Sequence, residues 1–288
     1  MSQEEESPQT SFLYIMQQMP ELPEVETIRS QLEKYLVGHK IEKIDVRVAK
    51  IFASGKEKLV GGRVKSLRRF GKVLVIDLTN GYSFLIHLKL TGQVVFSSPK
   101  LPNKESSYTH VVFHLDKNAN LFFNDSRKFG WIKVEKTAEV EAEPFVKKLG
   151  PEPLKNLTLK KFQEILASTR RPVKILLLDQ EKLSGVGNIY ANDALWEAKI
   201  NPRRPANSLG LSEQSKLLGA IEEILKIGLK YQGASDQWYI TAEGKKGRYQ
   251  EHFLVYGRVG ESCRRCGAKI RRVVVGGRGT FICANCQK

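Results

Sequence analysis

The chain has 288 residues, of which 41% are hydrophobic, and it carries a formal net charge of +16 at pH 7. This length and composition favour two folded domains with buried cores, and no apolar run approaches the roughly 18 residues of a membrane span. So large a basic excess indicates a polyanionic partner, although a soluble basic protein without one is an alternative.

The first 19 residues differ from the rest in charge and pattern. They contain three glutamates and no lysine or arginine. They lack the basic start and long apolar core of a secretory signal, and they lack the arginines of a mitochondrial transit peptide. We therefore predict that residues 1–19 form an extension, disordered or absent from the mature protein, and that the protein is cytoplasmic.

Helical spacing opens the next segment, and strand-like runs follow it. Val25, Ile28, Leu32 and Leu36 lie on one helical face, and Gly38 follows as a stop signal. Many short strands with close turns are typical of a β-sandwich or barrel and not of a βαβ unit. The strands are expected at 41–48, 64–70, 73–78, 83–88, 94–96, 110–115, 119–123 and 131–134.

The second half of the chain has a different pattern. Residues 137–154 are rich in glutamate and proline and are predicted to form a linker. Helical periodicity then predicts helices at 159–166, 173–178, 189–196 and 212–231. A loop rich in glycine and charge at 232–248 and a short strand at 253–256 are expected before the cysteine-containing tail.

The four cysteines form the clearest metal-binding pattern. Cys263 and Cys266 are separated by two residues, as are Cys283 and Cys286, and sixteen residues lie between the pairs. Two such pairs complete the tetrahedral shell of one structural zinc ion and leave no open position for catalysis. Free or disulfide-bonded cysteines are the alternatives.

Between the cysteine pairs, strand-like runs at 270–275 and 280–282 flank Gly276-Gly277-Arg278-Gly279. This pattern predicts a β-hairpin with Arg278 at its tip, where glycines let the backbone approach a ligand closely. Phosphate binding is the favoured role, because residues 263–288 contain seven basic residues and no acidic one. A solvated basic turn is the alternative.

A second glycine-containing loop, Gly185-Val186-Gly187, stands just before an expected helix. Such a loop directs backbone N–H groups and a helix N-terminus toward an anion. An ordinary turn between two helices would give the same pattern.

The run from Met19 to Glu26, Met-Pro-Glu-Leu-Pro-Glu-Val-Glu, resembles the first residues of the bacterial formamidopyrimidine-DNA glycosylase family, which removes oxidised purines from DNA. Further segments are similar to motifs of that family and occur in the same order, so the resemblance covers essentially all of residues 19–288. These segments are 87–92, 125–130, 149–154, 182–191 and the cysteine tail.

The resemblance implies an α+β, multidomain fold: an N-terminal β-sandwich with an opening helix, then a helical helix–two-turn–helix domain with a C-terminal zinc-finger β-hairpin. The implied boundaries are 20–136 for the catalytic domain, 137–154 for the linker, 155–257 for the DNA-binding domain and 258–288 for the zinc finger. The implied partner is double-stranded DNA containing oxidised bases or abasic sites, bound by a nucleoid-associated monomer.

The activity implied by the resemblance is that of a bifunctional DNA glycosylase and abasic-site lyase. Pro20 would attack C1′ of the extruded nucleotide as the base departs, and Glu21 would deliver or relay protons at the sugar. Lys72 would act in β-elimination of the 3′ phosphate. Arg278 would act in δ-elimination, where an always-charged guanidinium neutralises the departing phosphate.

The resemblance also implies residues that fill the space of the extruded base. Phe129 would wedge a base step while Arg127 bonds the orphaned base, although a buried Phe129 is the alternative. Leu90 stands where the family usually has a methionine that fills this space.

Three further residues match family positions that touch DNA. Asn188 matches a DNA-contacting asparagine. Tyr108 stands where a histidine is usual and could keep a phosphate hydrogen bond. Lys174 would meet a phosphate, with a solvated lysine as the alternative.

In the family, the proline is the chain terminus and its secondary amine is the nucleophile, whereas eighteen residues precede Met19 here. A peptide nitrogen shares its lone pair with the carbonyl and cannot attack carbon. We therefore expect the working protein to begin at Pro20. The alternatives are a same-fold glycosylase for oxidised pyrimidines, a non-catalytic lesion-binding protein if Pro20 stays blocked, and a zinc-bearing RNA- or ribosome-associated protein.

Overall fold

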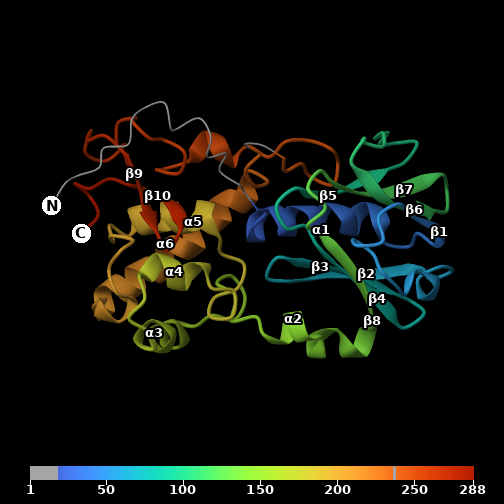
Figure 1. Cartoon of the computed structure of the whole chain (residues 1–288), viewed down its shortest axis with the longest axis horizontal. Helices are drawn as coiled ribbons and strands as arrows, with labels where there is room; N and C mark the ends of the chain where they lie inside the picture. The colour runs from blue at the N-terminus through green and yellow to red at the C-terminus, as the bar shows by residue number, and fades with distance from the viewer. Residues whose placement is uncertain (1–18, 236–237) are drawn as a thin grey trace.

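The computed structural model describes residues 19–235 and 238–288, so the expectations for residues 1–18 lie outside the described residues. The chain forms two lobes, a β-sandwich and a group of helices that carries a small β-hairpin (Figure 1). The predicted α+β fold class is confirmed.

Helix α1, Leu22–Leu36, joins the two lobes. Its side chains Val25, Ile28, Leu32 and Leu36 are buried in the core of the sandwich, as their spacing predicts. Leu22, at its first turn, belongs instead to the core of the helical lobe. The N-terminus of α1 therefore lies at the junction of the lobes (Figure 1).

The sandwich consists of two four-stranded antiparallel sheets. One sheet has the order β1-β6-β7-β5, formed by Ile41–Val46, Thr109–Leu115, Ala119–Asp125 and Gly92–Ser97. The other has the order β2-β3-β4-β8, formed by Val64–Phe70, Val73–Leu78, Tyr82–His87 and Trp131–Lys136. All eight strands expected from the sequence are present, with ends shifted by a few residues.

The outer face of the second sheet is covered by the segment that was predicted to be a linker. This segment contains a 3₁₀-helix, η3 (Thr137–Ala142), and a short helix, α2 (Pro144–Lys147). Val140 and Val146 pack against the outward-facing Val73, Val75 and Leu85. These valines cover apolar residues on the outer face of the sheet, so the segment predicted as a linker packs on the sandwich.

The helical lobe contains the four helices that periodicity predicted. They are α3 (Leu159–Ala167), α4 (Val173–Leu178), α5 (Asn188–Glu197) and α6 (Leu211–Lys230), and short 3₁₀ turns lie at Ala206–Ser208 (η4) and Tyr249–His252 (η5). A further 3₁₀ turn, η2 (Lys56–Lys58), lies in the sandwich lobe between β1 and β2. In the described part of the chain, no helix is long and apolar enough to cross a membrane.

The hairpin pairs β9 (Arg271–Val275) with β10 (Arg278–Ile282). Gly276 and Gly277 form its two-residue turn, and both have positive φ, which such a hairpin turn requires. A Cβ at Gly276 would lie 2.3 Å from Cδ1 of Ile175, so the turn also packs closely on α4.

The short strand predicted at 253–256 does not form. The buried carboxylate of Asp193 on α5 accepts hydrogen bonds from the backbone N–H groups of Leu254, Val255 and Tyr256 at 3.0–3.2 Å. It also accepts one from the hydroxyl of Tyr249 at 2.9 Å. Because one side chain occupies these donors, the segment has no need of a strand partner.

Candidate functional site

A cleft of about 480 Å³ lies between the two lobes. Residues of the sandwich and of the helical lobe line it together, and six of them are predicted site residues. These six are Glu21, Lys72, Leu90, Phe129, Asn188 and Arg278.

Hydrogen bonds to the loop before α5 fix Glu21 at this cleft. The backbone N–H of Leu22 donates to the carbonyl of Gly185 at 3.0 Å, and the N–H of Ile189 donates to Oε1 of Glu21 at 2.8 Å. The sequence indicated an anion at this helix N-terminus. The structure places the chain's own Glu21 carboxylate there.

Gly187 is the glycine on which this contact depends. A Cβ at this position would lie 2.3 Å from Cδ of Glu21. Its φ of −136° is open to any residue, so the requirement for glycine is steric and comes from the carboxylate.

The environment of Glu21 favours its protonated form. Burial raises the pKa of Glu21 to about 7; the charge of Lys72 opposes this shift, and the charge of nearby Glu24 contributes to it. Oε2 of Glu21 accepts no hydrogen bond from any described residue. A carboxyl group that titrates near neutrality and borders a cleft can donate or accept a proton there.

Glu24 is a site residue that the sequence reasoning missed. Its buried carboxylate accepts hydrogen bonds from the hydroxyl of Tyr190 at 2.6 Å, the N–H of Ala234 at 2.7 Å and the N–H of Glu21 at 2.9 Å. It therefore ties α1 to α5 and to the loop after α6. The only sequence signal was its place three residues after Glu21, where a capping-box acid reaches back to the helix start.

Lys72 lies in the two-residue turn between β2 and β3, and it is buried. Burial lowers the pKa of Lys72, while the charges of Glu21 and Glu24 oppose the shift. The turn is held by Arg69, which donates to the carbonyl of Gly71 at 2.7 Å. Arg69 also donates to both carboxylate oxygens of Glu152 at 2.6 and 2.7 Å. These bonds fix the position of Lys72 relative to the helical lobe.

The loop that carries Arg127 and Phe129 is held by a buried carboxylate. Asp125 accepts hydrogen bonds from the hydroxyl of Thr91, from the N–H of Arg127 at 3.1 Å and from the N–H of Gly130 at 2.7 Å. Phe129 is 46% exposed, so the alternative of a buried Phe129 is wrong. The guanidinium of Arg127 lies 4.8 Å from the centre of the Phe129 ring.

Leu90 directly precedes Thr91, so the same Thr91–Asp125 hydrogen bond links it to that loop. Leu90 is half-buried and lines the cleft with Phe129.

Tyr108 is exposed and does not line the cleft. Its ring lies edge-on to that of Trp238, with centroids 6.0 Å apart.

The tip of the hairpin is held over the cleft by α4 and α5. The ammonium of Lys174 donates to the carbonyl of Gly279 at 2.8 Å and to the hydroxyl of Thr280 at 2.7 Å. The amide of Asn188 also donates to the carbonyl of Gly279, at 3.2 Å. The alternative of a solvated Lys174 is wrong, because this side chain is fully buried.

Arg278, one residue from this anchor, is exposed and lines the cleft. Burial lowers the pKa of Lys174 to about 7; the charge of Glu21 opposes this shift, and the charge of Arg278 contributes to it. The guanidinium is thus the exposed cation at the hairpin tip, and the buried lysine supports it.

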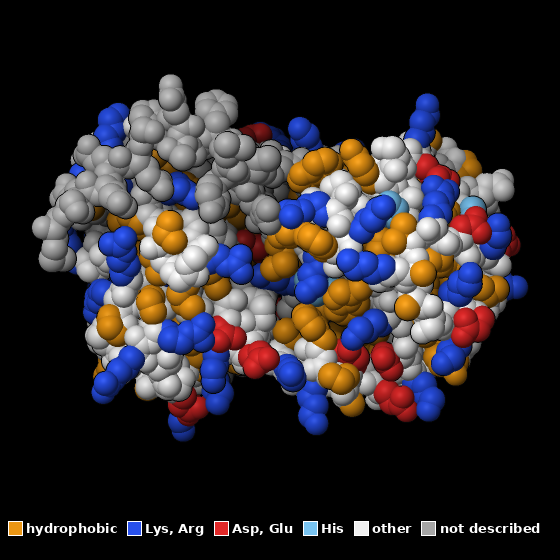
Figure 2. All heavy atoms as spheres, viewed as in Figure 1, with side chains coloured by type: hydrophobic (Ala, Val, Ile, Leu, Met, Phe, Trp, Pro, Cys, Tyr) orange, Lys and Arg blue, Asp and Glu red, His pale blue; other side chains and the backbone are white. Residues whose placement is uncertain are grey.

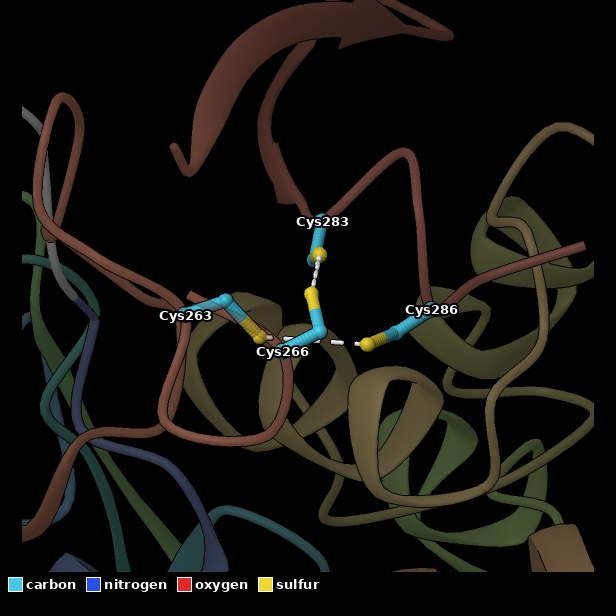
Figure 3. Close-up of side chains that lie close together, drawn as sticks. All are labelled: Cys263, Cys266, Cys283 and Cys286. Atoms are coloured by element: carbon cyan, nitrogen blue, oxygen red, sulfur yellow. Dashed lines mark hydrogen bonds between the residues drawn. The ribbon is translucent and has the colours of Figure 1, made fainter. Parts of the chain in front are cut away.

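The four cysteines point toward one another from two loops (Figure 3). Sγ of Cys263 lies 3.9 Å from Sγ of Cys286, and Sγ of Cys266 lies 3.4 Å from Sγ of Cys283. A tetrahedron with Zn–S bonds of about 2.3 Å has S···S edges of about 3.8 Å. The arrangement fits one structural zinc ion held by thiolates at the base of the hairpin.

Basic side chains are numerous on the visible face of both lobes (Figure 2). Figure 2 shows lysine and arginine side chains on both lobes and along the line where the lobes meet. Acidic side chains on this face lie mainly toward its lower and right-hand edges (Figure 2). An excess of basic side chains on this face attracts a polyanion.

Three family models match the chain in succession. They describe the formamidopyrimidine-DNA glycosylase N-terminal domain (residues 19–132), the H2TH domain of the same enzymes (149–239) and a zinc finger found in FPG and IleRS (260–288).

Curated relatives are similar over almost their whole length. The formamidopyrimidine-DNA glycosylase of Desulforamulus reducens is 40% identical over 277 residues, covering 94% of this chain and 99% of the relative. That of Listeria monocytogenes is also 40% identical, covering 94% of this chain and 100% of the relative.

Solved structures of formamidopyrimidine-DNA glycosylases are also similar to this chain. Fpg of Lactococcus lactis in complex with DNA containing an abasic site has a TM-score of 0.85 at 35% identity, covering 93% of this chain and 99% of that one. The Fpg protein of Thermus thermophilus has a TM-score of 0.85 at 36% identity, covering 93% of this chain and 98% of that one.

Proposed function

Because the chain belongs to the formamidopyrimidine-DNA glycosylase family of base-excision repair, we propose that it excises oxidised purines from double-stranded DNA and then cleaves the strand at the abasic site. The substrates are 8-oxoguanine and formamidopyrimidines. The main support for the proposal is the position of two buried residues beside the cleft that Arg278 borders. They are Lys72 and Glu21, and Glu21 directly follows Pro20 in the chain.

The first step is covalent. The lesion nucleotide is extruded into the cleft, and the neutral nitrogen of Pro20 attacks C1′ as the base departs. Glu21, with its pKa raised to about 7 by burial, gives a proton to the opening sugar. The resulting iminium of a secondary amine carries no N–H proton, so it remains a cationic electron sink.

Strand cleavage follows from the iminium. Lys72 acts in β-elimination, in which the C3′–O3′ bond breaks and the 3′ phosphate leaves. Its lowered pKa favours the neutral amine, which can take up a proton. Arg278 acts in δ-elimination by neutralising the 5′ phosphate, a role supported by its exposed position at the glycine turn.

DNA is held from both lobes. Phe129 enters the base stack and Arg127 bonds the orphaned base, which their exposed, stacked arrangement supports. Leu90 fills the remaining space beside them. Tyr108 and Asn188 contact the backbone.

Lys174 acts on DNA either by a direct phosphate contact or through the hairpin that it supports. The cysteine tail holds the structural zinc. We propose that the sandwich (20–136), the linker (137–154), the helical domain (155–257) and the zinc finger (258–288) act together as a monomer.

The proposed chemistry requires Pro20 to carry a free amine. The test is borohydride trapping on a duplex with one 8-oxoguanine, using a chain that starts at Met1 and one that starts at Met19 and loses that methionine. A covalent complex through Pro20 in the shorter chain supports the proposal. The absence of any complex from both chains would refute it. Parallel duplexes with an oxidised pyrimidine separate the two lesion classes.

A further inference from the structure

Lys72 has an unusual position among the amines of this chain. It lines the main cleft and also a second cavity of about 260 Å³, whose walls include His87, Phe145 and Leu149. In the described part of the chain, its ammonium forms no hydrogen bond, although the carboxylates of Glu21 and Glu24 act on it electrostatically. The nitrogen is therefore held near a proton donor and is free to meet a ligand.

The other amines near the site are placed differently. The ammonium of Lys174 is fully buried and is engaged by Gly279 and Thr280. Lys89 lines both cavities, but it is only half-buried, and its ammonium lies 5.7 Å from the centre of the Phe145 ring. Of these three lysines, Lys72 alone is both buried and open to the cleft beside Glu21.

We propose that a chain in which Pro20 remains in a peptide bond is an abasic-site lyase that uses Lys72 as its nucleophile. This inference rests on the proposed function only in that the cleft receives abasic DNA. Under this proposal, the chain with a blocked Pro20 has an activity of its own, cleavage at abasic sites.

The proposed reaction requires no oxidant or reductant. The neutral Nζ of Lys72 adds to the C1′ aldehyde of the ring-opened sugar, and the carbinolamine loses one water to give an iminium. The Glu21 carboxylate, left after its proton has gone to the departing water, then takes a C2′ proton; the C3′–O3′ bond breaks, and the 3′ phosphate leaves with the electron pair. One water hydrolyses the imine and returns the amine with an unsaturated aldehyde.

Burial supports this role, because desolvation lowers the pKa of Lys72 and so increases the fraction of neutral amine. Glu21 can supply the proton that the carbinolamine needs in order to lose water. An intact lesion offers no free aldehyde, since its C1′ is bonded to the base. The blocked chain should therefore cleave preformed abasic sites and leave 8-oxoguanine in place.

The experiment uses the full chain, with its intact N-terminus verified by mass spectrometry, and a duplex carrying one abasic site made from deoxyuridine. Borohydride should trap a covalent complex, and peptide mapping should place the sugar remnant on Nζ of Lys72. Lys72→Arg should lower the trapped fraction by at least about tenfold. Lys65→Arg, an exposed lysine on the same β2–β3 hairpin, should leave it unchanged.

A duplex with a tetrahydrofuran site, which has no aldehyde, reports whether Lys72→Arg still folds and binds. Peptide mapping is done on the unsubstituted chain, so it identifies the modified residue even if Lys72→Arg folds poorly. An adduct on Lys89 or on the Met1 amine, or no adduct from the full chain, overturns the inference. If the chain starting at Pro20 is trapped through Pro20 while the full chain is not, only the inference fails. If neither is trapped, the proposed function fails as well.

Discussion

Replacing Gly187 with alanine tests whether the position of Glu21 controls the chemistry. The new Cβ would lie 2.3 Å from Cδ of Glu21, about 1 Å short of an ordinary contact. The backbone at Gly187 suits alanine, so the carboxylate has to move, and its 2.8 Å hydrogen bond from Ile189 is lost or stretched.

A displacement of about 1 Å at a reacting group costs on the order of 100-fold in rate, which corresponds to about 2.7 kcal/mol of transition-state stabilisation. Overpacking of a buried site should also lower the free energy of unfolding by about 1–3 kcal/mol. Single-turnover excision of 8-oxoguanine by the chain starting at Pro20 measures the first effect. Urea unfolding measures the second.

Gly219→Ala is the matched control. Gly219 lies inside α6, and nothing lies within 4 Å of the Cβ that alanine would add. Alanine should therefore raise stability by about 0.5–1 kcal/mol and leave the excision rate unchanged. A wild-type excision rate for Gly187→Ala would refute the view that the Glu21 carboxylate must be held in this place.

Four further predictions concern pH, stability, zinc and the exposed ring. Burial raises the pKa of Glu21 from 4.5 to about 7, so the stability that this proton contributes is present below pH 4.5 and is lost as pH rises through 7. Between pH 4.5 and pH 7, the free energy of unfolding measured by urea titration should therefore fall less for Glu21→Gln than for the wild type. Asp193→Ala leaves several buried N–H groups unpaired and should lower the unfolding free energy by at least about 3 kcal/mol in the same assay. Removing zinc, by chelation or by Cys283→Ser, should release the hairpin and weaken binding to a tetrahydrofuran duplex at least about tenfold by anisotropy, because folding of such a site depends on the metal. Phe129→Ala should change stability by less than about 0.5 kcal/mol in thermal unfolding, since the ring is exposed, yet it should slow excision; an unchanged rate would count against the wedge role.

Much of the site could be predicted because its residues lie in short motifs whose chemistry is local. The cysteine spacing alone specified a tetrahedral sulfur site, and the structure brings the four sulfurs within 4.8 Å of one another. The glycine turn next to Arg278 likewise predicted a hairpin tip. In both cases neighbours along the chain supply the geometry.

The predictions that were wrong or incomplete involve partners far away in the chain. Residues 253–256 have the composition of a strand, but Asp193, about sixty residues earlier, takes their N–H groups. Lys174 could have been solvated on sequence grounds, but Gly279 and Thr280, more than one hundred residues later, enclose its ammonium. No periodicity indicates which distant side chain will satisfy a buried donor.

The strands, the helices, the sulfur site and the candidate residues could be predicted from local patterns, because spacing and side-chain chemistry act over a few neighbours. The position of the Glu21 carboxylate at the N-terminus of α5, and the link that Glu24 makes between α1 and α5, follow from long-range contacts in the folded protein. The same packing places Lys72 at the cleft between the lobes, where Glu21 also lies and where the charges of Glu21 and Glu24 act on it. Burial and long-range hydrogen bonding decide the protonation of these groups, and both exist only once the two lobes pack together.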